Sequence, residues 1–189
     1  MCSSTKAFLI KIAQIKRLIL NDNFFIGITG SSGKTSLKET LYKILKKYEN
    51  TYKSQKSFNN HIGLPITLAN QKRKSKFNIY EVGMNKLGEI HYLSNILKPN
   101  IGVITNIGEA HLGKLGSINN IAKAKSEIIE NIVKNGVIIL NRDCKYYRRL
   151  EKISKEKKLK ILSFGHNSRA TISFKIINYQ PIQIKFKKK

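Results

Sequence analysis

The chain has 189 residues, of which 41% are hydrophobic, and this is enough for one well-packed domain but not for two full ones. No apolar run reaches the roughly 20 residues that cross a bilayer. Lysines interrupt the apolar stretch from Phe8 to Leu20 before it could serve as a signal segment, so we expect a cytoplasmic protein without a membrane partner. Cys2 and Cys144 lie far apart and outside any metal-ligand spacing, which argues against a disulfide framework and a zinc site.

The formal net charge of +25 would suit a protein that binds nucleic acid, because lysine and arginine neutralise phosphates. A compositional bias explains the same charge, since 30 Lys, 29 Ile and 18 Asn against only 6 Arg are typical of a coding sequence rich in A and T. The lysines are scattered, and no RNA-binding aromatic signature or zinc-finger spacing accompanies them. We therefore predict no specific nucleic-acid partner, and an inactive basic nucleic-acid-binding relic is the alternative from outside the enzyme class.

The predicted elements alternate between helix and strand. Apolar residues at steps of three and four predict a helix over 5–20, and the apolar run 24–29 predicts a strand that leads through a glycine turn into a helical pattern. Further strands are expected at 51–54, 77–82, 101–105, 136–140 and 160–164, and helices at 63–70, 88–97, 118–134 and 145–157. This alternation favours an α/β fold in which helices cover both faces of a mostly parallel sheet. Ligands of such folds bind at the carboxyl ends of the strands.

A glycine-rich segment stands where a phosphate-binding loop belongs, between the first strand and its helix. It consists of Gly30, Ser31, Ser32, Gly33, Lys34, Thr35 and Ser36. Its backbone N–H groups can surround phosphate oxygens, Lys34 would contact the β- and γ-phosphates, and Thr35 would place its hydroxyl on Mg²⁺. The common pattern has glycine where this chain has Ile28, so an ordinary glycine turn is the alternative to the nucleotide site that we predict.

Glu81 and His111 are expected at the same edge of the sheet, because each follows a predicted strand. A carboxylate supplies the oxygen ligand that Mg²⁺ prefers, and a neutral imidazole could complete a second metal site, although histidine is an unusual ligand for magnesium. A hydrogen-bonded structural histidine is the alternative for His111.

Two polar segments have weaker signals. Asn59 and Asn60 precede a helical pattern and could hydrogen-bond a sugar or acyl group, but a helix entry explains them equally well. Lys123 and Lys125 belong to a predicted helix, where a solvated face is the alternative to a functional role.

Taken together and in order, five segments resemble the Mur ligase family. The similarity covers about residues 5–167, and its segments are 27–36, 59–65, 81–84 with 88–90, 105–111 and 122–128. The paired serines of the loop, the paired asparagines and the Gly-Glu-Ile element at 88–90 are most similar to members that add D-Ala-D-Ala to UDP-MurNAc-tripeptide.

The resemblance implies an ATP-dependent amide ligase of peptidoglycan synthesis, with ATP and Mg²⁺ as cofactors and UDP-MurNAc-peptide and D-Ala-D-Ala as partners. The γ-phosphate would pass to the peptide carboxylate, and the amine of D-Ala-D-Ala would attack the acyl phosphate. Residue by residue, the resemblance gives catalytic roles to Lys34, His111 and Lys125, substrate contacts to Asn59 and Asn60, and metal ligation to Thr35, Glu81, His111 and, if CO₂ carbamylates it, Lys125.

The resemblance also implies a domain organisation. It gives a linker helix at 1–22, an ATP-binding central domain at 23–169 that is incomplete at its C-terminal end, and a possible strand with a basic tail at 170–189. Longer family members add a domain that grips the uridine nucleotide and a domain that closes over ATP, which separate chains could supply here. We therefore expect Mg-ATP binding without ligation by this chain alone. A fragment of another ligase, of the Mur or folylpolyglutamate type, is the alternative within the enzyme class.

Overall fold

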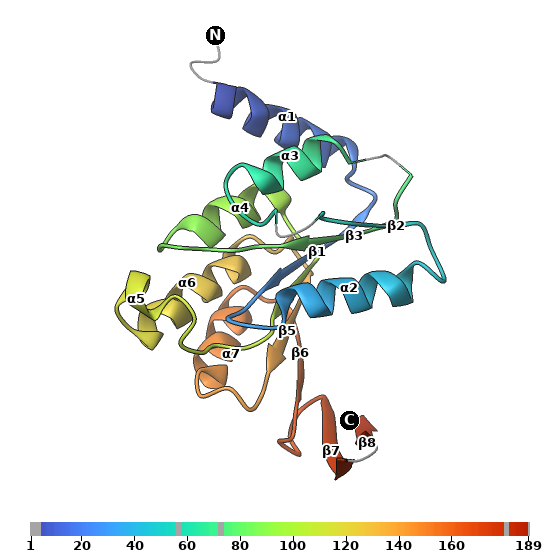
Figure 1. The fold of residues 1–189 in the computed structure, drawn as a ribbon, viewed down its shortest axis with the longest axis vertical. Helices are drawn as coiled ribbons and strands as arrows, with labels where there is room; N and C mark the ends of the chain where they lie inside the picture. The colour runs from blue at the N-terminus through green and yellow to red at the C-terminus, as the bar shows by residue number, and fades with distance from the viewer. Residues whose placement is uncertain (1–4, 56–57, 72–73, 180–181, 189) are drawn as a thin grey trace.

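The structure is a computed structural model that describes residues 5–55, 58–71, 74–179 and 182–188. Within these residues, an eight-stranded sheet has the strand order β2-β3-β1-β4-β5-β6-β7-β8 (Figure 1). The strands are β1 (Phe24–Thr29), β2 (Thr51–Lys53), β3 (Phe77–Glu81), β4 (Ile101–Ile104), β5 (Val137–Asn141), β6 (Lys160–Gly165), β7 (Ile172–Tyr179) and β8 (Ile182–Lys188). All neighbouring strands pair in parallel except β7 and β8, which are antiparallel. The predicted α/β fold with a mostly parallel sheet is therefore confirmed.

Helices cover both faces of this sheet, as predicted. They are α1 (Thr5–Ile19), α2 (Lys34–Leu45), α3 (Gly63–Ala69), α4 (Glu89–Leu97), α5 (Leu112–Leu115), α6 (Ile118–Glu130) and α7 (Tyr147–Glu156). Leu37, Leu41 and Leu45 of α2 pack on one face, and the buried residues of α1, α3, α4, α6 and α7 form a larger core on the other. Figure 1 shows α2 separated by the sheet from α3 and α4.

Strand β1 contributes side chains to both cores, one on each face of the sheet. The side chain of Phe25 joins the larger core, whereas Ile26 and Ile28 join the smaller one, because successive side chains of a strand point to opposite faces. Both cores therefore contact the strand that leads into the glycine loop.

Two glycines in the middle of the sheet let α6 and the residues after it approach the sheet closely. Gly27 and Gly102 are register partners on β1 and β4. A Cβ atom on Gly27 would lie 3.2 Å from Ile128 of α6, and one on Gly102 would lie 2.6 Å from Ile132, which follows the end of α6. The bare backbone at Gly27 is what seats α6, and with it Lys125, against the central strands.

The observed elements differ from the predicted ones in three places. Helix α6 ends at Glu130, four residues before the predicted end at 134, and the short helix α5 was not predicted. The segment 170–189 contains two strands instead of one, and Lys185, Lys187 and Lys188 of its lysine-rich end belong to β8, with exposed side chains. Among the described residues no helix has the length and apolar character of a membrane span, and Cys144 is an unpaired thiol. Cys2 lies outside the described residues, as do the outermost residues of the predicted ranges 1–22 and 170–189.

Helix α1 is fastened to α4 by one buried arginine. Arg17 is only 8% exposed. Its Nε donates to the carbonyl of Leu97 at 2.7 Å, its Nη2 donates to the carbonyl of Lys98 at 2.9 Å, and its guanidinium lies 4.1 Å from the centroid of the Phe25 ring. These carbonyls belong to the C-terminal end of α4, where a helix leaves them without partners of its own. Ala13 and Leu20 complete the buried side of this segment, whose opposite side exposes Phe8, Ile12, Ile15, Leu18 and Ile19.

Replacing this arginine should destabilise the domain. We expect Arg17→Met to lower the free energy of unfolding by about 3 kcal/mol, because the carbonyls of Leu97 and Lys98 lose a charged donor and the first of these bonds is buried. Lys11→Met, which removes an exposed lysine of the same helix, should change it by less than about 0.5 kcal/mol. Urea denaturation followed by circular dichroism measures both, and equal midpoints for the two variants would contradict this role of Arg17.

Candidate functional site

The glycine loop connects the end of β1 with the start of α2. Gly30 has a φ of 151° and Gly33 a φ of 76°, a backbone region that favours glycine. A Cβ atom on Gly30 would lie 1.8 Å from Oγ1 of Thr105, so a side chain does not fit there. Gly33 is the N-cap of α2 and supplies no side-chain cap, so the first N–H groups of the helix are able to bind a ligand. This geometry suits an anion such as a phosphate.

The loop is held by the segment that follows β4. The Ser31 N–H donates to the carbonyl of Asn106 at 3.1 Å, and the Ser31 hydroxyl donates to the carbonyl of Gly108 at 3.0 Å. The Ser32 N–H donates to Oδ1 of Asn106 at 2.9 Å, and the Thr105 hydroxyl donates to the carbonyl of Ser32 at 2.7 Å. In this conformation both serines anchor the loop, although the sequence led us to expect that they bind a ligand.

Lys34 lies over the loop that it follows. Its Nζ donates to the carbonyl of Gly30 at 2.9 Å, and its side chain lines the pocket described below. Burial lowers the pKa of Lys34, and the nearby carboxylate of Glu81 opposes this shift. The ammonium is therefore partly desolvated and is held at the backbone of the glycine loop.

Glu81 ends β3 at the same edge of the sheet, and its side chain is 1% exposed. Nζ of Lys38 lies 2.9 Å from Oε1 of Glu81, so the two form a buried ion pair. The contact is not aligned as a hydrogen bond, and Oε1 has no hydrogen-bond donor among the described residues. The sequence patterns do not single out Lys38, although it follows Lys34 by four residues and therefore lies on the same side of α2.

The donor atoms near the loop suit Mg²⁺ in part. The described residues contain no group of three or more His, Cys, Asp or Glu side chains that could hold a metal ion by themselves. Oε1 of the Glu81 carboxylate accepts no hydrogen bond from the described residues. The buried hydroxyl of Thr29 also has no hydrogen-bond partner among them. Magnesium binds through one or two carboxylates together with substrate phosphates and water, so this oxygen chemistry fits a magnesium ion that arrives with a nucleotide.

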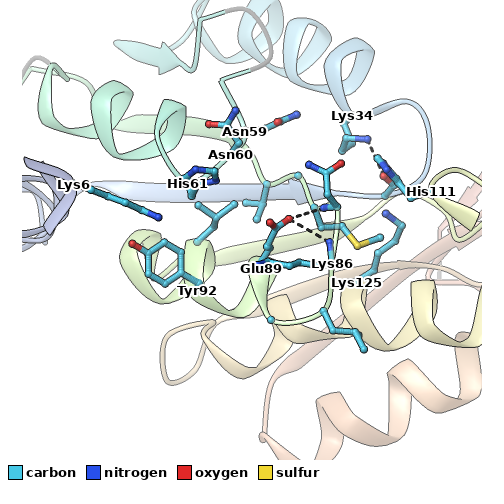
Figure 2. Close-up of a pocket in the computed structure, with 18 residues that line it drawn as sticks. Lys6, Lys34, Asn59, Asn60, His61, Lys86, Glu89, Tyr92, His111 and Lys125 are labelled. Carbon is cyan, nitrogen blue, oxygen red and sulfur yellow. Dashed lines mark hydrogen bonds between the residues drawn. The ribbon is translucent and has the colours of Figure 1, made fainter. Parts of the chain in front are cut away.

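His111 and Lys125 meet Lys34 at one end of a pocket, as Figure 2 shows. Burial, followed by the charge of Lys34, lowers the pKa of Lys125 to about 7. Burial also lowers the pKa of His111, and the charges of Lys125, Lys34 and Lys114 lower it further. Three basic groups that repel one another form an environment that an anion would stabilise. Lys125 is 1% exposed, so the alternative of a solvated face is wrong for it, whereas Lys123 is exposed.

The pocket has a volume of about 600 Å³ and extends from the glycine loop toward α1. At its far end lie Lys6, His61 and Tyr92, opposite the basic cluster (Figure 2). Residues 82–89, between β3 and α4, form one side. Such an elongated shape can hold a second ligand next to a nucleotide.

Asn59 and Asn60 line this pocket between its two ends. The carbonyl of Asn59 accepts from the Gly83 N–H at 2.8 Å. Oδ1 of Asn60 accepts from the N–H groups of Ile62 at 3.1 Å and Gly63 at 2.8 Å, at the start of α3. Asn60 therefore serves as a helix entry, while both residues also face the space where a substrate would lie.

The pocket brings together only some of the predicted site residues. Those that line it are Gly30, Lys34, Asn59, Asn60, His111 and Lys125, whereas Ser31, Ser32, Gly33, Thr35, Ser36 and Glu81 are not part of its lining. Apart from His61, the pocket residues that the sequence patterns did not single out as a site are Lys6, Tyr92, Leu93 and the segment 82–89. Only their place in the fold identifies them, because their residue types carry no signal for a site.

Comparisons with known proteins agree with this geometry. A family profile described as "Mur ligase middle domain" matches residues 28–188. The UDP-N-acetylmuramoyl-tripeptide--D-alanyl-D-alanine ligase of Rickettsia prowazekii is 45% identical over 159 residues, which are 84% of this chain and 35% of that protein. The chain thus spans about a third of the length of this curated relative.

Solved structures of MurF are similar over nearly the whole chain. Crystal structure I of MurF from Acinetobacter baumannii superposes with a TM-score of 0.88 at 30% identity, covering 98% of this chain and 42% of that one. MurF ligase from Thermotoga maritima, solved in complex with ADP, has a TM-score of 0.86 at 29% identity and covers 97% and 42%. Since the profile and the relatives match most of its residues, the chain belongs to the Mur ligase family, in which it corresponds to the middle domain.

Proposed function

We propose that this domain binds Mg-ATP and activates a carboxylate in the ligase reaction that joins D-Ala-D-Ala to UDP-MurNAc-tripeptide, in the cytoplasm. The observation that supports this most directly is the meeting of Lys34, His111 and Lys125 beside a glycine loop at one end of an elongated pocket. A nucleotide at the loop and a peptide in the remaining space would meet at these three groups.

The phosphates of ATP would lie on the loop. The N–H groups at the start of α2 donate to phosphate oxygens, and the partial positive charge of the helix N-terminus adds to their attraction. Lys34 would exchange its bond with the Gly30 carbonyl for a phosphate oxygen. Thr35 and Glu81 would hold Mg²⁺, which offsets the negative charge of the triphosphate and the approaching carboxylate.

The peptide would occupy the pocket with its terminal carboxylate near Lys34. A carboxylate oxygen would attack the γ-phosphorus of ATP, and the bond between this phosphorus and the β,γ-bridging oxygen would break. The products are an acyl phosphate and ADP. The amine of D-Ala-D-Ala then attacks the acyl carbon, the C–O bond breaks, and inorganic phosphate and one proton are released. The domain contributes position and fixed charge, with Asn59 and Asn60 orienting the substrate.

Lys125 would act in either of two states. As an ammonium it offsets phosphate charge, because a nearby phosphate raises the pKa that burial has lowered. As a neutral amine it can attack CO₂, forming an N–C bond and releasing a proton, and the resulting carbamate could join His111 in holding a second metal ion. A pKa of about 7 supplies the neutral amine at physiological pH.

Complete ligation would use parts of the longer relatives that these 189 residues do not span. We propose that the rest of a ligase, whether in the same polypeptide or supplied by separate chains, provides the grip on the uridine nucleotide and on the amine. The 189-residue chain alone should then bind Mg-ATP but form no ligated product, and detection of product from the purified chain would contradict this division.

Nucleotide binding tests the proposed function. In calorimetric titration at physiological salt, Mg-ATP should bind the chain saturably, and Lys34→Ala should weaken binding at least about tenfold, as expected for a lost charge-assisted contact. Physiological salt matters because a net charge of +25 attracts any polyanion at low ionic strength.

Lys43→Ala is the matched control, since Lys43 is exposed near the other end of α2. Its removal changes the net charge by the same amount and should leave the affinity for Mg-ATP unchanged. Equal affinities of the Lys34 and Lys43 variants, or no binding by the parent, would overturn the proposed nucleotide site.

Stability should depend on pH through Lys125. Its pKa is about 7 in the folded chain and 10.5 ordinarily, so between these values the unfolded chain binds more protons and the free energy of unfolding rises with pH. We expect Lys125→Met to be more stable than the parent below pH 7, and this difference to shrink as the pH rises from 7 to 10.5. Urea denaturation of the parent and of Lys125→Met, without ligands and in CO₂-free buffer, measures this difference at each pH. Parallel pH profiles of the two free energies of unfolding would show that Lys125 is not desolvated as described.

A further inference from the structure

One side of the pocket includes a short segment between β3 and α4. We call residues 84–88 the wall loop, because all five line the pocket. Met84 is buried, whereas residues 85–88 are exposed. The position of this segment therefore contributes to the shape of the pocket.

The wall loop is joined to α6 by the carboxylate of Glu127. Oε1 of Glu127 accepts from the Gly88 N–H at 2.8 Å, and Oε2 accepts from the His91 N–H at 3.0 Å. These donors belong to the N-cap and the first turn of α4, where a helix leaves its N–H groups unpaired and favours a negative charge. Glu127 is two residues after Lys125, so one helix carries both a basic group of the pocket and the anchor of the wall loop.

Two further bonds fix the beginning of the loop. Oε2 of Glu89 accepts from the Asn85 N–H at 2.5 Å, and Nζ of Lys114 donates to Oδ1 of Asn85 at 2.8 Å. Lys114 belongs to α5, which begins directly after His111. The loop is therefore tied at both of its ends to helices that carry or follow site residues.

The bonds of Glu127 are not needed to dock α4 on α6. Ile90 and Leu93 of α4 and Ile121 and Ile128 of α6 are 0–1% exposed in one core, and this apolar contact holds the helices together. A second polar link joins the same helices farther along, where Nδ1 of His91 lies 2.8 Å from Oε2 of Glu130. What Glu127 adds is the placement of the first turn of α4 and of the loop before it.

We propose that Glu127 is a positioning residue that fixes the wall loop and thereby shapes the part of the pocket that takes the acceptor, a peptide ending in a carboxylate. This inference rests on the proposed function. The glycine loop is anchored separately, through Ser31 and Ser32 to the segment after β4. Loss of the Glu127 bonds therefore affects the acceptor and leaves the nucleotide in place.

Glu127→Gln tests this with a minimal change of shape. The amide keeps one acceptor oxygen, but its NH₂ group faces a backbone N–H, so one bond is lost and replaced by repulsion. We expect the affinity for UDP-MurNAc-tripeptide, measured by calorimetry, to fall about tenfold, while Mg-ATP affinity stays within about twofold. Amide hydrogen exchange of residues 84–88 should accelerate about tenfold in the same variant.

Glu130→Gln is the matched control, because it alters the other polar link between α4 and α6 outside the pocket. It should change neither acceptor affinity nor exchange in the wall loop. Lys114→Met removes an exposed anchor of the same loop without a risk to folding, and should weaken acceptor binding in the same direction.

Three results would overturn the inference: parental acceptor affinity in Glu127→Gln, equal losses in the Glu127 and Glu130 variants, or no acceptor binding by a parent chain that binds Mg-ATP. The last result would leave the nucleotide site standing. Absence of Mg-ATP binding would instead refute the proposed function itself.

Discussion

The buried charges at the carboxyl ends of the central strands are the constraint on which this domain depends. Lys38 and Lys125 are almost fully buried and Lys34 is partly so, whereas Glu81 is the only fully buried acidic side chain in the described part of the chain. Removing cations from water costs free energy unless an opposite charge compensates, and one carboxylate does not balance three ammonium groups. The lowered pKa values of Lys34 and Lys125 are the result. An anionic ligand would supply the missing charge, so its binding and the stability of the domain are coupled.

The sheet makes this concentration of charge possible because it brings distant segments to one edge. Parallel pairing places the ends of β1, β3 and β4 side by side, which joins the glycine loop to Glu81 and to the segment before His111. Lys125 arrives by a different route, on a helix that can approach because Gly27 has no side chain. The parallel sheet thus brings the charged side chains of the site to one edge, and the apolar cores hold the elements that carry them in place.

The sequence predicts the elements well because most of them depend on local patterns. The bounds of β1, α1 and α3 agree with the periodicity to within one residue, since apolar spacing and glycine turns define them. The roles of Lys38 and Glu127 were not predictable in this way. In a lysine-rich chain, the sequence pattern around a lysine predicts an exposed side chain. In the same way, a glutamate on a helix is predicted to belong to the exposed polar face. Only the tertiary structure shows that the first meets Glu81 and that the second reaches the N-terminus of α4. The end of β8 was hidden for the same reason, because lysines obscure the alternation of Ile182, Ile184 and Phe186.

Helix α4 is held at both ends by side chains from other helices, by Arg17 at its last carbonyls and by Glu127 at its first N–H groups. Its nine residues form a rod about 13 Å long, too short to bend appreciably. A short helix that is bonded at both ends moves as a rigid body, so a shift at one end is accompanied by a shift at the other. A force that shifts α1 along its axis would therefore be carried through Arg17 into α4 and would appear at the other end as a movement of the wall loop. The pocket is thus connected through α4 to α1, which also lines it directly through Lys6 and exposes apolar side chains on its other side.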